Sequence, residues 1–315
     1  MNHQDQIYDS ALDLIGQTPL VRLSRINPYS NIDLLGKLES VNPGGSVKDR
    51  VGLRMILDAE DSGLLQKGGT IVEPTSGNTG LGLSMVAAVK GYNVILVMPD
   101  NMTSERRILL SSYGAELVLT PGILGMGGAV KKAEEIIEEN PDYFMPQQFK
   151  NLSNVDIHRE TTAEEIWKAT KGQITTFVAA VGTGGTISGV GQFLKNKNQE
   201  IRVIAVEPSV SPVISKKPIE SLVHAIQGTG AGFIPDILDT SIIDEVVLID
   251  DDEAYNMARR IGLDEGLLVG ISAGANVCAS LKIAKEMGKG QIVTILCDTG
   301  ERYLSIREYF DGQLD

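Results

Sequence analysis

Residues 69–80 read Gly-Thr-Ile-Val-Glu-Pro-Thr-Ser-Gly-Asn-Thr-Gly, an apolar run followed at once by a polar, glycine-rich turn. The apolar run predicts a buried strand, and the small hydroxyl residues after it predict that a helix begins near Thr79. The same order of apolar run, turn and helical stretch recurs further along the chain. This alternation indicates a mostly parallel sheet covered by helices on both faces, so we expect an α/β protein.

The segments after residue 80 extend this pattern. The further predicted strands are 93–98, 115–119, 174–181, 203–207, 245–249 and 292–296, and the further predicted helices include 103–113, 129–139 and 160–170. The pattern breaks at 141–154, which predicts a domain boundary, and 208–233 is typical of a long functional loop. Ligands of open α/β sheets bind beyond the carboxyl ends of the strands, so the strand-to-helix turns are the candidate sites.

Length and charge narrow the class of protein. A chain of 315 residues suggests about two domains. Its net charge of −13 disfavours nucleic acid and anionic membranes as partners. No apolar run approaches the roughly 18 residues of a membrane span, and the N-terminus lacks the features of a signal peptide. With two cysteines in no paired spacing and three scattered histidines, we expect a cytoplasmic protein without a metal site.

The turn at 42–50, Asn-Pro-Gly-Gly-Ser-Val-Lys-Asp-Arg, admits two interpretations. Ser46 and Asp49 have the spacing of a capping box that opens a helix. A capping box does not explain Lys48, because a cation in the first turn of a helix opposes the helix dipole. The same field favours a neutral, nucleophilic amine, so a Schiff-base lysine is the second interpretation.

Three further turns each precede a predicted helix; the first two could bind an anion, and the third could supply a hydroxyl. They are 73–80, 182–189 (Gly-Thr-Gly-Gly-Thr-Ile-Ser-Gly) and 270–276. An ordinary capped turn is the alternative at 73–80, and an N-cap is the alternative for Ser272 at 270–276. A dinucleotide site is a rival at 182–189, with Glu207 as its ribose-binding acid, although Ile187 stands where the glycine fingerprint needs glycine. Together the turns offer a reactive amine, anion cradles and a hydroxyl, which pyridoxal phosphate chemistry requires.

The strings at 42–50 and at 74–80 (Pro-Thr-Ser-Gly-Asn-Thr-Gly) closely resemble the cysteine synthase (O-acetylserine sulfhydrylase) family, and the resemblance extends from Ile15 to Leu304. That family belongs to the tryptophan-synthase-β-like, fold type II pyridoxal phosphate enzymes. The resemblance implies two three-layer α/β/α domains with the cofactor between them. The smaller, mobile domain is expected at 42–153, and the larger one combines 1–41 with 154–315.

The resemblance also implies residue roles. Lys48 would hold pyridoxal 5′-phosphate as a Schiff base and then remove the substrate α-proton. The other expected cofactor contacts are Asn78 to the ring oxygen, Gly182, Thr183, Gly184, Gly185 and Thr186 to the phosphate, and Ser272 to the pyridine nitrogen. The expected substrate-binding residues are Thr75, Ser76, Gly77, Thr79, Gln148 and Gly228.

The hydroxyl of Ser272 bears on the reaction, because it cannot keep the pyridine nitrogen protonated as a carboxylate would. This favours loss of a β-leaving group to give a bound aminoacrylate, followed by addition of a nucleophile in ping-pong kinetics. The expected reaction converts O-acetyl-L-serine and sulfide into L-cysteine and acetate. Three alternatives stay open: a sister enzyme that uses L-cysteine or another donor to make lanthionine or cystathionine with release of hydrogen sulfide, a non-catalytic regulatory protein that binds pyridoxal phosphate, and a nicotinamide dehydrogenase.

The sequence departs from the family pattern at three places. The usual Gly-Pro-His-Lys before Gln227 is replaced at 221–225 by Ser-Leu-Val-His-Ala, Gly127 replaces a usual lysine, and Cys297 replaces a usual proline. The first two departures leave open both the second substrate and the docking of serine acetyltransferase, a partner of family members. A homodimer acting on small amino-acid substrates is implied by the resemblance, and Cys297 is expected to be a buried strand-end residue without a role.

Overall fold

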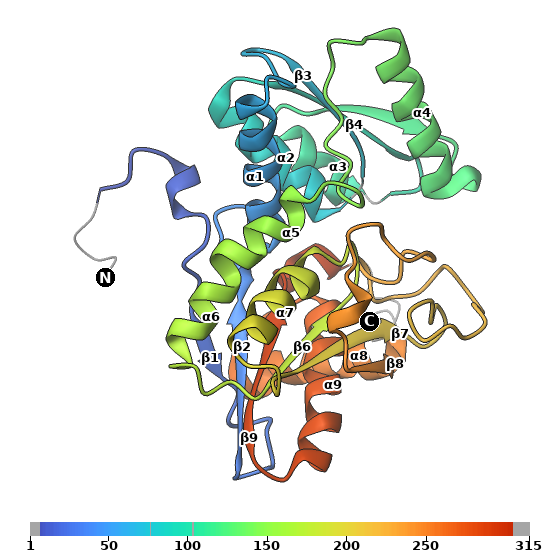
Figure 1. Cartoon of the computed structure of the whole chain (residues 1–315). Coiled ribbons are helices and arrows are strands. Elements are labelled where there is room, and N and C mark those ends of the chain that lie inside the picture. The colour runs from blue at the N-terminus through green and yellow to red at the C-terminus, as the bar shows by residue number, and fades with distance from the viewer. Residues whose placement is uncertain (1–6, 76, 103, 305–315) are drawn as a thin grey trace. The chain divides into compact units, whose positions relative to one another are not determined.

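Figure 1 shows the computed structural model, which describes residues 7–75, 77–102 and 104–304. The chain divides into two compact units. The first comprises residues 1–17 and 42–147, and the second comprises residues 18–41 and 148–315. These units assign 1–17 and 148–153 differently from the domains predicted at 42–153 and at 1–41 with 154–315. The limits of the domains stay a prediction.

The first unit contains a three-stranded parallel sheet in the order β3-β4-β5. Its strands are β3 (Thr70–Pro74), β4 (Asn93–Pro99) and β5 (Glu116–Thr120), and its helices are α1 (Lys48–Asp61), α2 (Asn78–Lys90), α3 (Ser104–Ser111) and α4 (Gly125–Glu139). Val97 of β4 packs with Ala129 and Ala133 of α4. The preceding residue, Leu96, packs against Gly80 of α2. Since neighbouring strand residues point to opposite faces, helices cover both faces of this sheet.

The second unit contains a six-stranded sheet in the order β1-β2-β9-β6-β7-β8, in which only the β1–β2 pair is antiparallel. Its strands are β1 (Leu20–Arg22), β2 (Ile32–Leu38), β6 (Thr176–Ala180), β7 (Arg202–Pro208), β8 (Glu245–Ile249) and β9 (Gly290–Leu296). Its helices are α5 (Ser153–Ile157), which runs through a π-helical turn (His158–Thr162) into α6 (Ala163–Ala169), then α7 (Gly185–Lys197), α8 (Asp251–Arg260) and α9 (Ile271–Met287).

The apolar core of the second unit lies on both faces of its sheet. Phe177 of β6 belongs to a buried cluster with residues of α6 and α7, whereas the next residue, Val178, belongs to a cluster with residues of α8 and α9. Adjacent strand residues therefore bury on opposite faces, which is the pattern of a three-layer α/β/α fold. The predicted fold class is confirmed.

The remaining short helices join these elements. They are 3₁₀ turns at Ala11–Leu14, Glu39–Val41, Gly122–Leu124, Thr240–Ile242 and Gly300–Tyr303 and a π-helical turn at Ile261–Glu265. None of the helices within the described residues is both long and apolar enough to cross a membrane. Within the same residues, no three His, Cys, Asp or Glu side chains are grouped as they would be around a metal ion.

Candidate functional site

Lys48 stands at the first position of α1, at the end of a turn that is hydrogen-bonded through its own side chains. The backbone N–H of Lys48 donates to Ser46 Oγ (3.2 Å), and the N–H of Gly44 donates to Asp49 Oδ2 (2.6 Å). The N-cap of α1 is Val47, without a side-chain cap. The predicted capping box of Ser46 and Asp49 is therefore wrong, because the Asp49 carboxylate binds back to Gly44.

Two glycines bring the start of α1 against α2. A Cβ placed on Gly52 would lie 2.6 Å from the carbonyl carbon of Gly82, and a Cβ on Gly82 would lie 2.5 Å from the carbonyl oxygen of Lys48. The two helices thus touch backbone to backbone. Since Asn78 stands one helical turn before Gly82, the main chain of Lys48 lies beside the first turns of α2.

We expect Gly82→Ala to destabilise the protein by about 1–3 kcal/mol, because the added methyl group cannot fit against the Lys48 carbonyl. To make room for the methyl group, the backbones of α1 and α2 must move apart, which would displace Lys48 and lower turnover. Urea unfolding measures the first effect. Gly127→Ala is the matched control, since a Cβ at Gly127 in α4 meets nothing within 4 Å and is expected to raise stability by up to about 1 kcal/mol. Equal stability of Gly82→Ala and the parent would contradict the packing argument.

The turn between β3 and α2 carries several of the predicted substrate-binding residues. The N–H of Thr75 donates to the Val97 carbonyl (3.1 Å), and the N–H of Gly77 donates to Thr75 Oγ1 (3.2 Å). Gly77 is the N-cap of α2 and supplies no side-chain cap. The first amides of a helix have no partner within the helix, so this end of α2 is suited to a carboxylate. Thr75 and Thr79 are buried there, and Ser76 lies outside the described residues.

Residues 182–186 form a tight turn at the N-terminus of α7, and three glycines are required for its shape. Gly184 has a φ of +87°, a conformation that L side chains rarely adopt. A Cβ on Gly182 would lie 2.0 Å from the Gly228 carbonyl oxygen, and a Cβ on Gly185 would lie 2.1 Å from Asn154 Oδ1. The backbone, the helix amides and the hydroxyls of Thr183 and Thr186 therefore offer a cradle that fits a phosphate group.

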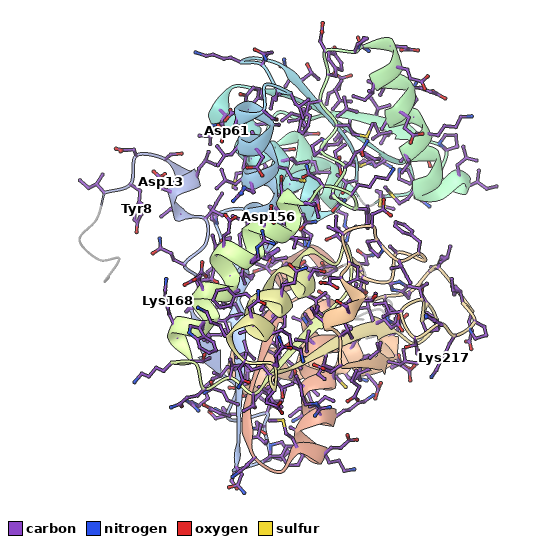
Figure 2. All side chains as sticks on the ribbon, viewed as in Figure 1. Tyr8, Asp13, Asp61, Asp156, Lys168 and Lys217 are labelled. Carbon is purple, nitrogen blue, oxygen red and sulfur yellow. The ribbon has the colours of Figure 1, made fainter. Side chains whose placement is uncertain are left out.

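Two buried side chains contact the hydroxyls of this cradle. Asn154 Nδ2 donates to Thr183 Oγ1 (3.0 Å), and His158 Nε2 lies 3.2 Å from Thr186 Oγ1. Both come from the continuous helical segment of α5, the π-helical turn and α6, on which Asp156 and Lys168 are labelled in Figure 2. Sequence reasoning missed them, since Asn154 lay in the break of the pattern and His158 had no metal-ligand spacing. Their spacing of four residues, which places both on one helix face, was the available signal.

Ser272 lies in the first turn of α9, whose N-cap is Gly270. The interpretation of Ser272 as an N-cap is therefore wrong. Asn276, one turn later, accepts from the N–H of Ala180 (2.6 Å) and donates to the Ile295 carbonyl (2.7 Å). These bonds fasten the start of α9 to the carboxyl ends of β6 and β9. Within the described part of the chain the Ser272 hydroxyl makes no hydrogen bond, and the residue is 6% exposed.

Two other predicted positions belong to the second unit. Gln148 is buried, and its carbonyl accepts from Asn154 Nδ2 (2.9 Å). Gly228 has a φ of +82° and places its carbonyl against Gly182. The predicted residues thus form two groups: Lys48, Thr75, Gly77, Asn78 and Thr79 in the first unit, and Gln148, Gly182–Thr186, Gly228 and Ser272 in the second.

Glu207 does not have the environment of a ribose-binding acid. Its carboxylate accepts from the N–H groups of Ile214 and Ser215 (both 2.9 Å) and from the Ser215 hydroxyl. The buried carboxylate therefore stabilises a turn of the chain. The dinucleotide interpretation is left without a residue to bind the ribose. Cys297 is partly buried after β9, not fully buried as expected, and its sulfur accepts a weak bond from Asn276 Nδ2 (3.6 Å).

Comparison with known proteins agrees with this geometry. Residues 11–298 match the family described as pyridoxal-phosphate dependent enzyme. The chain is 50% identical to a cysteine synthase of Staphylococcus aureus over 303 residues, 96% of this chain and 97% of that protein. The structure of a cysteine synthase from Entamoeba histolytica matches with a TM-score of 0.94 and 43% identity, covering 98% of this chain and 93% of that one. An O-ureido-L-serine synthase matches with a TM-score of 0.93 and 46% identity, covering 98% and 97%.

Proposed function

Because the chain belongs to the family of pyridoxal-phosphate dependent enzymes, we propose that it is a β-replacement enzyme that converts O-acetyl-L-serine and sulfide into L-cysteine and acetate. The observation that carries this proposal is the 50% identity with a cysteine synthase over 96% of the chain. The local geometry supports it, because a lysine stands at a helix start and a glycine turn provides a phosphate cradle.

Different residues would bind different parts of the cofactor. Bound pyridoxal 5′-phosphate supplies the electron sink that lets a substrate α-proton and a β-leaving group depart. The cradle at 182–186 would hold the phosphate through backbone amides and the Thr183 and Thr186 hydroxyls, and Asn78 would bond the ring oxygen. Lys48 Nζ would anchor the cofactor covalently and would accept the α-proton of the substrate.

The side chain of Ser272 is neutral, and we infer that this affects which reaction the cofactor supports. The resemblance implies that Ser272 would meet the ring nitrogen of the cofactor. A carboxylate there would favour a proton on that nitrogen, whereas a hydroxyl would provide no negative charge. The site therefore withdraws electrons less strongly. This favours departure of a β-leaving group over reactions that need a long-lived negative charge on the α-carbon, such as transamination.

The substrate carboxylate would bind at the N-terminus of α2, near the buried Thr75 and Thr79 and the N-cap Gly77. Ser76, which lies outside the described residues, is proposed as a further contact. In the second unit, Gln148 and Gly228 are proposed as further substrate-binding residues, as the family resemblance implies. Since these residues are proposed to bind the carboxylate that amino-acid substrates share, they would not by themselves select the nucleophile of the second half-reaction.

The test measures both half-reactions in the purified holoenzyme. We expect O-acetyl-L-serine and sulfide to give L-cysteine with ping-pong kinetics. The alternative is a sister enzyme, and the 46% identity to an O-ureido-L-serine synthase is the observation that favours testing other acceptors. Sulfide release from L-cysteine, with no cysteine formed from O-acetyl-L-serine, would overturn the proposal.

A cytoplasmic location and a homodimer complete the proposal. Both cysteines are free thiols, which supports a reducing compartment. The homodimer comes from the family resemblance, and whether serine acetyltransferase docks depends on the substituted positions near Gln227 and at Gly127.

The two thiols are expected to differ in reactivity. Burial raises the pKa of the Cys278 thiol, and the nearby Glu253 carboxylate raises it further. We therefore expect iodoacetamide to modify Cys278 at least roughly tenfold more slowly than the more exposed Cys297 in the native protein. Mass spectrometry of timed samples, with a urea-unfolded sample as control, gives the two rates. Equal native rates would contradict the prediction.

A further inference from the structure

We propose that Asn154 is a positioning residue that holds the hydroxyl of Thr183 as a hydrogen-bond donor to the cofactor phosphate. The inference rests on the proposed function, because it takes the turn at 182–186 as the phosphate cradle. It adds a residue from a different helix, 29 positions away in the sequence from the hydroxyl that it contacts.

The orientation of the Asn154 amide is fixed by its second contact. Asn154 Nδ2 lies 2.9 Å from the Gln148 carbonyl oxygen and 3.0 Å from Thr183 Oγ1. A carbonyl oxygen can only accept, so the atom that faces it must be the NH₂ group. The two hydrogens of that group serve the two oxygens, and Asn154 is therefore a donor to Thr183.

This contact decides where the Thr183 hydrogen points. A hydroxyl has one hydrogen and two lone pairs. Its oxygen faces Asn154 Nδ2 at 3.0 Å and the N–H of Gly185 at 3.5 Å, and both of these groups are donors. The hydroxyl hydrogen must then point away from both, so it is available to an acceptor held in the cradle. Thr183 is preorganised to donate to a phosphate oxygen.

The packing around Asn154 shows that the fold makes room for this amide. Asn154 is 1% exposed, and its Oδ1 occupies the place that a side chain at Gly185 would need. Burying an amide is costly unless its polar atoms are hydrogen-bonded. Because the same NH₂ group holds the backbone of Gln148, one amide ties the phosphate cradle to a residue expected to bind the substrate carboxylate.

The experiment is a double-mutant cycle with Asn154→Ala, Thr183→Ala and the double variant. The readout is the dissociation constant of pyridoxal 5′-phosphate from the apoenzyme, with the ³¹P chemical shift of the bound phosphate. We expect Asn154→Ala to weaken binding about tenfold in the parent and less than about twofold in the Thr183→Ala background, because it acts through that hydroxyl. Asn27→Ala is the matched control, since Asn27 Nδ2 also donates to a backbone carbonyl, that of Ile32 at the start of β2; it should leave cofactor binding unchanged.

The outcomes separate this inference from the proposed function. If the parent binds pyridoxal phosphate and makes cysteine but the Asn154→Ala loss is the same in both backgrounds, the positioning role is wrong and the proposed function stands. If the parent binds no pyridoxal phosphate, the proposed function itself fails. Should Asn154→Ala not fold, the isosteric Asn154→Asp replaces it. Its carboxylate would accept the Thr183 hydrogen, so a ³¹P shift and affinity equal to the parent's at pH 8 would contradict the inference.

Discussion

Lys48→Ala is expected to lower the rate of cysteine formation by at least about 10³-fold, because it removes the proposed covalent anchor of the cofactor and the proposed base for the α-proton. The position of Lys48 makes this replacement informative. Its main chain is held between the Ser46 hydroxyl and the backbone of α2, so loss of the side chain leaves the surrounding turn in place. Turnover should therefore fall while the stability of the apoenzyme stays close to that of the parent.

A second measurement tests for the covalent link between Lys48 and the cofactor. Reduction of the holoenzyme with borohydride should fix the cofactor on the peptide that contains Lys48, and the variant should yield no such peptide. Lys67→Ala is the control, since Lys67 is an exposed lysine of the same unit and should change neither measurement. A Lys48→Ala protein that kept a reducible cofactor link elsewhere and near-parent turnover would contradict the assignment.

Gly182→Ala is expected to weaken the binding of pyridoxal 5′-phosphate by at least about 100-fold. The added Cβ would lie 2.0 Å from the Gly228 carbonyl oxygen, far inside van der Waals contact. A backbone atom cannot turn aside as a flexible side chain can, so either the cradle or the turn at Gly228 must move. Either movement would misplace the amides that are proposed to bind the phosphate, and each lost hydrogen bond to a charged group costs about 1.5–3 kcal/mol.

Equilibrium dialysis of the apoenzyme measures this affinity. Gly262→Ala is the control, because a Cβ there has only the Leu267 carbonyl oxygen, at 3.9 Å, within 4 Å. It should bind the cofactor as the parent does. A Gly182→Ala protein with parent-like affinity would show that the close approach of Gly182 to Gly228 is unimportant for the cradle.

Much of the sheet could be predicted from the sequence, because buried parallel strands are short apolar runs bounded by turn residues. The strand at 245–249 is present with the predicted bounds, and β4 differs from its prediction by one residue. The strands β1 and β2 were missed. In β2 the buried Lys37 interrupts the apolar run, and its ammonium is satisfied by Glu165, 128 positions away (2.6 Å), a partner that no local pattern reveals.

The candidate site could be predicted in part for a similar reason. Glycine and hydroxyl residues at helix starts are visible locally, so the turns at 42–50, 74–80 and 182–186 were found. The residues that support them were not, since Asn154 acts on Thr183 from 29 positions away. The capping box at Ser46 was predicted but is absent. The local pattern fitted, but the Asp49 carboxylate accepts from the N–H of Gly44 instead.

The most direct test of β-replacement follows the holoenzyme by absorbance and product analysis when O-acetyl-L-serine is added first and sulfide second. We predict that O-acetyl-L-serine alone releases about one acetate per cofactor and shifts the visible band, and that sulfide then restores the band with formation of L-cysteine. A band that responds to L-cysteine with release of sulfide, but not to O-acetyl-L-serine, would contradict the account.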